Sequence, residues 1–259
     1  MVKIFVVTHK PVPPLVNDLY QTIRVNPGTE EHLDDAVLID NTGDNISGKN
    51  DNYCELTAAY WIAKNYHDAD YVGLCHYRRY FNLYKNLLSF SPSTQKRVSL
   101  DKFKKSKLYR TTPKKQEEHI EKILKDYDVI LPIHYTVGHE GKKVSLSENY
   151  AIGHRKEDFD LTKQIILEKY PKYEDSITSY LDDSSRFYVA NMFIASKTIF
   201  NDYYKWLFDV LFELERRIDI PTDNYQKRIF GFISERLTAM YFWHHNFKIK
   251  EMPLYHITD

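Results

Sequence analysis

Short apolar runs that end abruptly on polar residues recur along the chain and predict the buried strands of a sheet. Four runs have this pattern: residues 4–9, 36–40, 71–75 and 127–132. Residues 53–66 instead predict a helix, which Asn52 and Glu55 would open with a capping-box-like pair. Strands with a helix between them indicate an α/β fold with a mostly parallel central sheet.

The second half of the chain is dominated by longer helical patterns. Residues 157–170 predict a helix that stops before Pro171, and residues 200–218 carry apolar side chains at three- and four-residue spacing up to Pro221. A second long helix is expected over residues 225–244. Residues 188–195 predict a buried strand interrupted by Asn191, and residues 247–252 a final strand. The fold should therefore have a helical C-terminal part.

Residues 82–126 have no such pattern. Between residues 96 and 115 there are nine Lys or Arg side chains and one acidic residue, Asp101. We expect a solvated loop or insertion here. The alternative is a basic patch that contacts anionic lipid headgroups or a lipid-diphosphate acceptor.

Composition limits the class of protein. The 259 residues fit one domain, and 36 basic against 36 acidic residues give no overall charge that would favour nucleic acid. Two cysteines, Cys54 and Cys75, argue for a reducing compartment. The chain starts directly with a predicted strand, without the pattern of a signal peptide, and holds no apolar run near the ~18 residues that span a bilayer. We expect a cytoplasmic protein that at most docks on a membrane surface.

The segment after the third predicted strand carries the most informative chemistry. His76 ends the strand, and Arg78 and Arg79 follow between aromatic residues. Ligands of open α/β sheets bind at the carboxyl ends of the strands. Two guanidinium groups there suit a phosphate or diphosphate, and a nucleotide-sugar is the favoured ligand. The alternative is that both arginines pair with structural carboxylates beneath a loop.

Polar residues also follow the first two predicted strands. Thr8 and His9 end one strand, and Asp40 and Asn41 end the other. They could hydrogen-bond a uracil and its ribose, and they are equally well explained as turn-forming residues.

A divalent metal is not expected. Asp68 and Asp70 match the Asp-x-Asp motif of metal-dependent glycosyltransferases, but they precede a predicted strand instead of following it. We interpret them as a turn and cap. Fixed positive side chains can replace a metal in neutralising a leaving phosphate, so the favoured chemistry needs no metal and no cofactor.

Candidate proton acceptors lie further along the chain. Glu235 and Arg236 interrupt an apolar helical segment, where Glu235 could act as a general base and Arg236 could orient it or bind phosphate. An internal ion pair or a solvent-facing turn is the alternative. His154 and Asp158 lie in a second segment that could supply the general base. Alternatively, Asp158 could only stabilise the start of a helix through its dipole. Asn191 could contact a sugar or be structural.

Several of these segments occur together in a known order. They are Asp40 to Ser47, Tyr53 to Thr57, Gly73 to Phe81, Asn191 to Ile194 and Gly231 to Leu237. In these segments the chain resembles bacterial capsular and exopolysaccharide glycosyltransferases long filed as a domain of unknown function, some of which look like galactofuranosyltransferases. The resemblance extends from Lys3 to about Met252.

The resemblance implies one GT-A-like, Rossmann-related domain over residues 1–259, a UDP-sugar donor and a glycan or lipid-linked oligosaccharide acceptor. Its matched segments place seven residues around the donor: Thr8, His9, Asp40, Asn41, His76, Arg78 and Arg79. Asn191, Glu235 and Arg236 would lie near the reacting centre, with acceptor choice in residues 82–126 or around His154.

The predicted function is therefore transfer of a hexose, with galactofuranose as one candidate, in cell-surface polysaccharide synthesis. Glu235 would deprotonate the acceptor, while Arg78 and Arg79 stabilise the departing UDP, with inversion at the anomeric carbon. The alternatives are a non-catalytic nucleotide- or polysaccharide-binding protein of the same fold and a magnesium-dependent nucleotidyl- or phosphotransferase.

Overall fold

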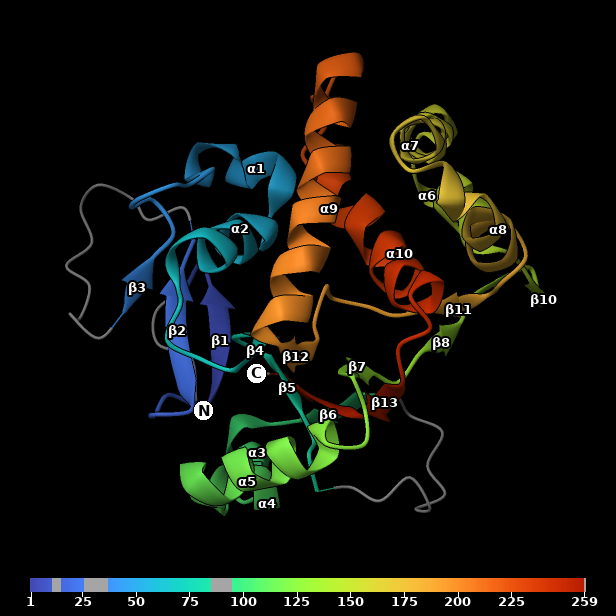
Figure 1. Ribbon diagram of the computed structural model, residues 1–259. Coiled ribbons are helices and arrows are strands. Elements are labelled where there is room, and N and C mark those ends of the chain that lie inside the picture. Colours follow the sequence, from blue (N-terminus) through green and yellow to red (C-terminus); the bar gives the residue numbers. More distant parts are fainter. Residues whose placement is uncertain (11–14, 26–36, 85–94, 259) are drawn as a thin grey trace.

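The computed structural model describes residues 1–10, 15–25, 37–84 and 95–258 of the chain (Figure 1). It confirms the predicted α/β fold with a central, mostly parallel sheet and a helical C-terminal part. Within these residues ten strands join in one sheet. They are β1 Val2–Thr8, β2 Tyr20–Arg24, β3 Leu38–Ile39, β4 Tyr71–His76, β5 Arg79–Phe81, β6 Gln95–Val98, β7 Val129–Pro132, β12 Ile194–Ser196, β13 Ile249–Met252 and β14 Leu254–Ile257.

The order of the main path through the sheet is β13, β7, β12, β4, β1, β2 and β3. β1 pairs in parallel with both β2 and β4, and β7 pairs in parallel with β13. β12 is antiparallel to its neighbours β4 and β7. Because β1 and β4 are parallel neighbours, the residues that follow them meet at one edge of the sheet. Two small antiparallel pairs, β8 Tyr135–Thr136 with β11 Arg186–Phe187 and β9 Gly138–His139 with β10 Lys142–Lys143, lie outside it.

Helices cover both faces of the sheet. They are α1 Asn50–Tyr53, α2 Leu56–Asn65, α3 Leu100–Lys104, α4 Lys107–Arg110, α5 Pro113–Leu124, α6 Leu146–Gly153, α7 Lys156–Lys169, α8 Glu174–Ser176, α9 Lys197–Arg217 and α10 Ile229–His244. Alternate residues of β1 serve the two faces, as expected for a strand. Phe5 and Val7 pack in the cluster formed with α2, α9 and α10, whereas Ile4 and Val6 pack in the cluster formed with α3–α5. Figure 1 shows these helical layers above and below the strands.

The helix predicted over residues 53–66 is interrupted near its start. Cys54 adopts a positive φ of 53° and separates α1 from α2. Asn52 does not cap the helix, because its side-chain amide donates to the Lys227 carbonyl at 2.9 Å. The capping-box prediction was therefore wrong, and a long-range contact to the start of α10 replaces it.

The strand predicted over residues 188–195 is also wrong for most of its length. Only Ile194–Ser196 pairs as a strand. Ala190 and Asn191 have φ values of 75° and 47°, which break an extended conformation. The apolar residues of this segment are buried in a turn, and burial alone gives them the composition of a strand.

Residues 82–126 are not a solvated loop where the structure describes them. They form β6 and the short helices α3–α5, and each helix inserts a fully buried side chain, Phe103, Leu108 or Ile120, beneath its lysines. The helices are hard to recognise in the sequence because each buried apolar residue stands among charged neighbours. Ser99 and Ser106 accept hydrogen bonds from backbone amides at the starts of α3 and α4.

Strand boundaries differ from the predictions at two further places. β2 is absent from the predicted elements, and the strand predicted over residues 36–40 is reduced to Leu38–Ile39, with residue 36 outside the described residues. β14 follows β13 directly and adds a strand beyond the predicted end. Among the described residues, no helix is long and apolar enough to cross a membrane.

Candidate functional site

A cavity of about 610 Å³ opens where β1 and β4 end. Thr8 and His9 follow β1 into its wall, and His76 comes from the end of β4. Helix α10 contributes Glu235 from the opposite side. The structure thus brings five of the predicted site residues into one cavity: Thr8, His9, His76, Arg79 and Glu235.

Glu235 is a partly buried carboxylate that lines the cavity, with 22% of its side chain exposed. Its Oε1 accepts a hydrogen bond from the Ala190 amide at 2.6 Å. Burial raises the pKa of Glu235 to about 7, although nearby Arg236 opposes the rise. A carboxylate with a pKa close to neutral pH can exchange a proton with a substrate, which is the property required of a general base.

Asn191 does not line this cavity but hydrogen-bonds to Glu55, which does. Its side-chain amide donates to Glu55 Oε1 at 2.7 Å and to the Gly231 carbonyl at 3.2 Å. Its Oδ1 accepts a hydrogen bond from Ser234 Oγ at 2.9 Å. Asn191 is 3% exposed, and these bonds, which join the turn to α10, favour the structural one of its two predicted roles.

His76 fixes the same turn from the other side. Its Nε2 lies 2.7 Å from the Ala190 carbonyl, a contact in which Nε2 must carry the proton. Burial lowers the pKa of His76, which favours the neutral ring. The Ala190 carbonyl therefore accepts a hydrogen bond from His76, and the Ala190 amide donates one to Glu235. The backbone of this one residue thus fixes both side chains.

Three cationic side chains reach the cavity. Arg79 comes from β5, and its Nε is buried with no hydrogen-bond partner among the described residues. Arg228 precedes α10, donates from Nε to Cys54 Sγ at 3.3 Å and packs on the Phe232 ring. Lys227 lies 3.0 Å from Asp51. A guanidinium group that lines a cavity offers planar, permanently charged donors that suit a phosphate oxygen.

Arg78 points elsewhere. It is absent from the cavity wall, and its guanidinium carbon lies 5.3 Å from the centre of the Tyr77 ring. Arg78 lies in the turn between β4 and β5, whereas Arg79 is the first residue of β5. The structure therefore places one of the two predicted clamp arginines in the site, and Arg228 takes the place expected for the other.

The remaining predicted donor residues divide into two groups. The Thr8 hydroxyl donates to the Lys10 carbonyl at 2.8 Å, and the His9 ring packs edge-on against Tyr77 at the cavity mouth. Asp40 is fully buried and accepts a hydrogen bond from Ser47 Oγ at 2.7 Å, while Asn41 is exposed. Neither Asp40 nor Asn41 lines the cavity.

The three other predicted substrate residues lie outside the cavity, on the side of α10 that faces α6 and α7. Arg236 donates to Asn149 Oδ1 at 3.0 Å and packs over the Phe187 ring. His154 Nδ1 lies 3.0 Å from Gln226 Oε1. Asp158 is buried against Arg155 at 2.7 Å. These contacts favour structural roles for all three residues.

Sequence reasoning missed Glu55, Lys227 and Arg228 as residues of the site. Glu55 was interpreted only as a cap, and the two cations lie inside the helix predicted over residues 225–244, without a recognisable motif. Asp68 and Asp70 are exposed before β4, at the end of the strand away from the cavity, as predicted. Within the described residues, no three His, Cys, Asp or Glu side chains converge in a metal-binding group.

The chain belongs to the family described as a domain of unknown function (DUF4422), which it matches over residues 3–246. Its structure is similar to the apo structure of WbbM, a bifunctional glycosyltransferase, with a TM-score of 0.86 and 32% sequence identity. The match covers 100% of this chain and 45% of that chain, so this chain spans less than half the length of WbbM. A comparison with curated proteins finds no match.

Proposed function

We propose that this chain is a glycosyltransferase that moves a hexose from a UDP-sugar to a hydroxyl of a glycan or lipid-linked oligosaccharide. The observation that carries the proposal is that one cavity combines a carboxylate whose pKa lies near 7, Glu235, with the guanidinium groups of Arg79 and Arg228. The similarity to the bifunctional glycosyltransferase WbbM supports the same class.

In the proposed reaction, the acceptor hydroxyl attacks the anomeric carbon of the donor. Its oxygen forms the new glycosidic bond, and the proton passes to Glu235. The bond from the anomeric carbon to the diphosphate breaks, and the electron pair leaves with UDP. Arg79 and Arg228 stabilise the charge that develops on the leaving diphosphate. A base on the face opposite the leaving group gives inversion of configuration.

Arg79, Lys227 and Arg228 supply positive charge where the diphosphate would lie, so we propose that transfer does not require a divalent metal. Thr8 and His9, which lie at the same edge of the sheet, would contact the uridine. This arrangement follows the rule that nucleotides bind beyond the carboxyl ends of parallel strands. Galactofuranose is one candidate for the transferred sugar. We propose that the reaction serves the synthesis of a cell-surface polysaccharide.

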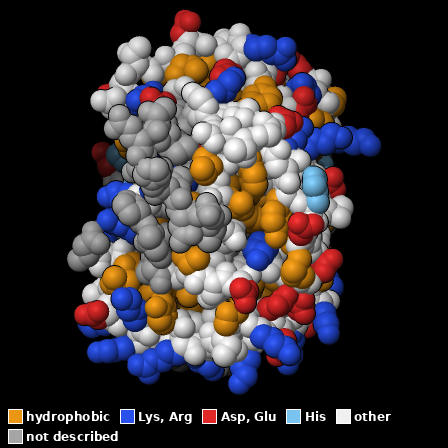
Figure 2. All heavy atoms as spheres, turned by 90° about the vertical axis from the view of Figure 1, so that its left-hand side faces the viewer, with side chains coloured by type: hydrophobic (Ala, Val, Ile, Leu, Met, Phe, Trp, Pro, Cys, Tyr) orange, Lys and Arg blue, Asp and Glu red, His pale blue; other side chains and the backbone are white. Residues whose placement is uncertain are grey.

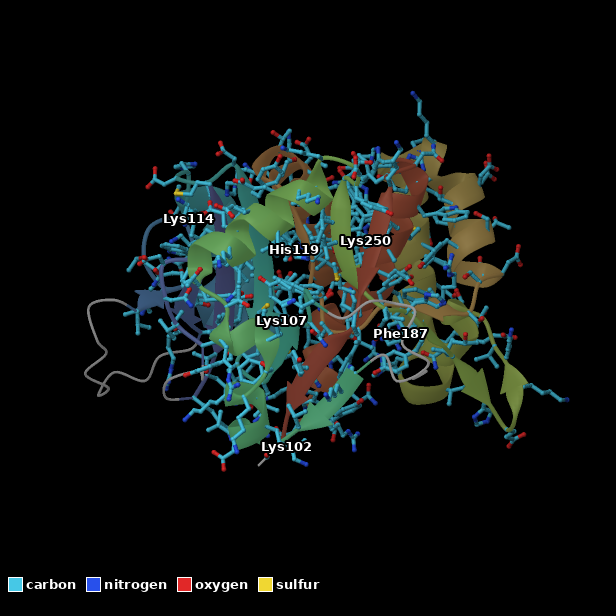
Figure 3. All side chains as sticks on the ribbon, turned by 90° about the horizontal axis from the view of Figure 1, so that it is seen from below. Lys102, Lys107, Lys114, His119, Phe187 and Lys250 are labelled. Atoms are coloured by element: carbon cyan, nitrogen blue, oxygen red, sulfur yellow. The ribbon has the colours of Figure 1, made fainter. Side chains whose placement is uncertain are left out.

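We further propose that the protein docks on the cytoplasmic face of a membrane through a basic surface of α3, α4 and the start of α5. Its side chains are Lys102, Lys104, Lys105, Lys107, Arg110, Lys114 and Lys115, of which all are exposed. Figure 2 shows Lys and Arg gathered along the lower end of the molecule, and Figure 3 labels three of these lysines. Anionic headgroups attract such clusters by about 1 kcal/mol per basic residue.

The test is UDP release from a panel of UDP-sugars, including the furanose form of galactose, with and without EDTA. We expect release from one donor that survives EDTA and accelerates on addition of an acceptor glycan. Release abolished by EDTA would keep the transferase and overturn the metal-independent mechanism. Binding of UDP-sugars by calorimetry without turnover on any acceptor tested would favour the non-catalytic binding protein.

A further inference from the structure

A second cleft, of about 540 Å³, lies on the other side of the turn that carries Ala190. Its walls come from the end of α10, the segment after β11, and β13. Five aromatic residues line it, among them Tyr127, Tyr188 and Trp243, together with three charged residues, Arg186, Lys250 and Glu251. We propose that this cleft binds the saccharide chain of the acceptor, beyond the sugar whose hydroxyl reacts.

The combination of side chains fits a neutral saccharide. Trp243 is 49% exposed, and an indole face open to solvent can cover the apolar C–H face of a sugar ring. Arg186 and Lys250 offer hydrogen-bond donors to hydroxyl groups. A lipid tail would instead strip water from these charges without replacing their hydrogen bonds, which is unfavourable.

The cleft is also rigidly built. Glu251 Oε1 accepts a hydrogen bond from the Tyr188 hydroxyl at 2.5 Å and lies 2.7 Å from His134 Nδ1. Arg186 lies 4.0 Å from the same carboxylate. Tyr188 is thereby fixed against β13, so the cleft does not depend on an induced rearrangement of the turn. Preorganisation of this kind lowers the entropic cost of binding.

The position of the cleft relative to the cavity indicates which part of the substrate it takes. Tyr188 lines the cleft, and the next two residues, Val189 and Ala190, line the cavity. Glu235 and Trp243 stand eight residues apart on α10, which corresponds to about 12 Å along the helix. An oligosaccharide with its reacting end at Glu235 can therefore reach Trp243. Figure 1 shows the end of α10 beside β11, and Figure 3 labels Lys250 on β13.

The role as an acceptor site rests on the proposed transferase activity, whereas affinity for a saccharide does not. The first experiment is therefore direct binding of the fluorescently labelled full chain to an array of bacterial oligosaccharides of graded length and charge. We expect binding to neutral oligosaccharides, a loss of at least tenfold in Trp243→Ala, and near-normal binding in Trp243→Phe. Tyr225→Ala is the matched control, because Tyr225 is 55% exposed and lies outside the cleft.

Equal binding by wild type and Trp243→Ala would overturn the proposal, as would wild-type binding to no saccharide on the array. If circular dichroism shows that Trp243→Ala is misfolded, Lys250→Ala tests the same cleft from the strand side and should also weaken binding. With a responsive acceptor, Trp243→Ala should raise the acceptor KM for long saccharides and leave kcat unchanged. Binding through Trp243 without UDP release would retain the cleft and refute the transferase.

Discussion

Replacement of Glu235 by glutamine should separate the activity of this protein from its stability, because the two should change in opposite directions. Glutamine has nearly the same size and can still accept the hydrogen bond that the Ala190 amide now gives to Oε1. It cannot take a proton from an acceptor hydroxyl. Since general-base catalysis contributes about 10²- to 10⁴-fold to a rate, we expect kcat to fall by that factor.

The effect on stability follows from the pKa of Glu235. Burial raises this pKa from its usual 4.5 to about 7, so the folded state favours the protonated carboxyl. The stability that this group contributes is complete below about pH 4.5 and is lost as the pH rises through about 7. Each pKa unit corresponds to about 1.4 kcal/mol, which gives an upper value of roughly 3 kcal/mol at pH 8. Glutamine avoids this penalty.

The assay compares wild type and Glu235→Gln by UDP release and by thermal unfolding at pH 5 and pH 8. We expect the variant to unfold several degrees higher than wild type at pH 8 and at nearly the same temperature at pH 5. Wild-type kcat/KM should rise with pH through about 7. Full activity in Glu235→Gln, or the same difference in Tm at both pH values, would refute the reasoning. If Glu55→Gln instead abolishes the rise with pH, the proton acceptor is Glu55.

Three further sets of variants test other parts of the structure. Arg79→Ala should weaken donor binding by about 10- to 150-fold, as expected for charge-assisted hydrogen bonds, and Arg78→Ala should change it little; equal losses in donor titrations would contradict the cavity assignment. Asn191→Ala should lower the free energy of unfolding by about 1–3 kcal/mol, since it leaves buried partners unsatisfied, and an unchanged urea midpoint would argue against that network. The double variant Lys102→Glu, Lys107→Glu should bind phosphatidylglycerol vesicles at least about tenfold more weakly than wild type, with phosphatidylcholine vesicles as the control; unaltered sedimentation with the anionic vesicles would exclude this docking surface.

The parts of the fold that were predictable are those in which local pattern and burial coincide. β4 is an apolar run that stops at His76, and α9 carries a regular apolar stripe, so both were predicted close to their observed positions. β2, with the sequence Tyr-Gln-Thr-Ile-Arg, has only two apolar residues in five positions and shows neither an apolar run nor a regular alternation. The turn at Ala190 was predicted as a strand because its residues are mostly apolar, and an apolar sequence does not reveal which residues adopt positive φ values.

The site shows the same division between local and distant information. Glu235 could be selected from the sequence because a charge inside an apolar helix needs an explanation. Cys54 and Arg228 are 174 residues apart, and only the folded chain brings them together beside Glu55. Arg78 and Arg79 could not be distinguished in the sequence, since the direction of each side chain depends on which residue enters β5.

The short strand β12 also has a consequence for the order in which the chain can assemble. β12 spans three residues, yet it is the only connection along the main sheet path between the β4–β1–β2–β3 half and the β7–β13 half among the described strands. During synthesis, β4 therefore emerges more than one hundred residues before the strand that covers its edge. Until residues 194–196 arrive, that edge offers unpaired backbone groups on which another chain could assemble. Fragments that end before β12 should aggregate, and co-translational folding should depend on protection of this edge.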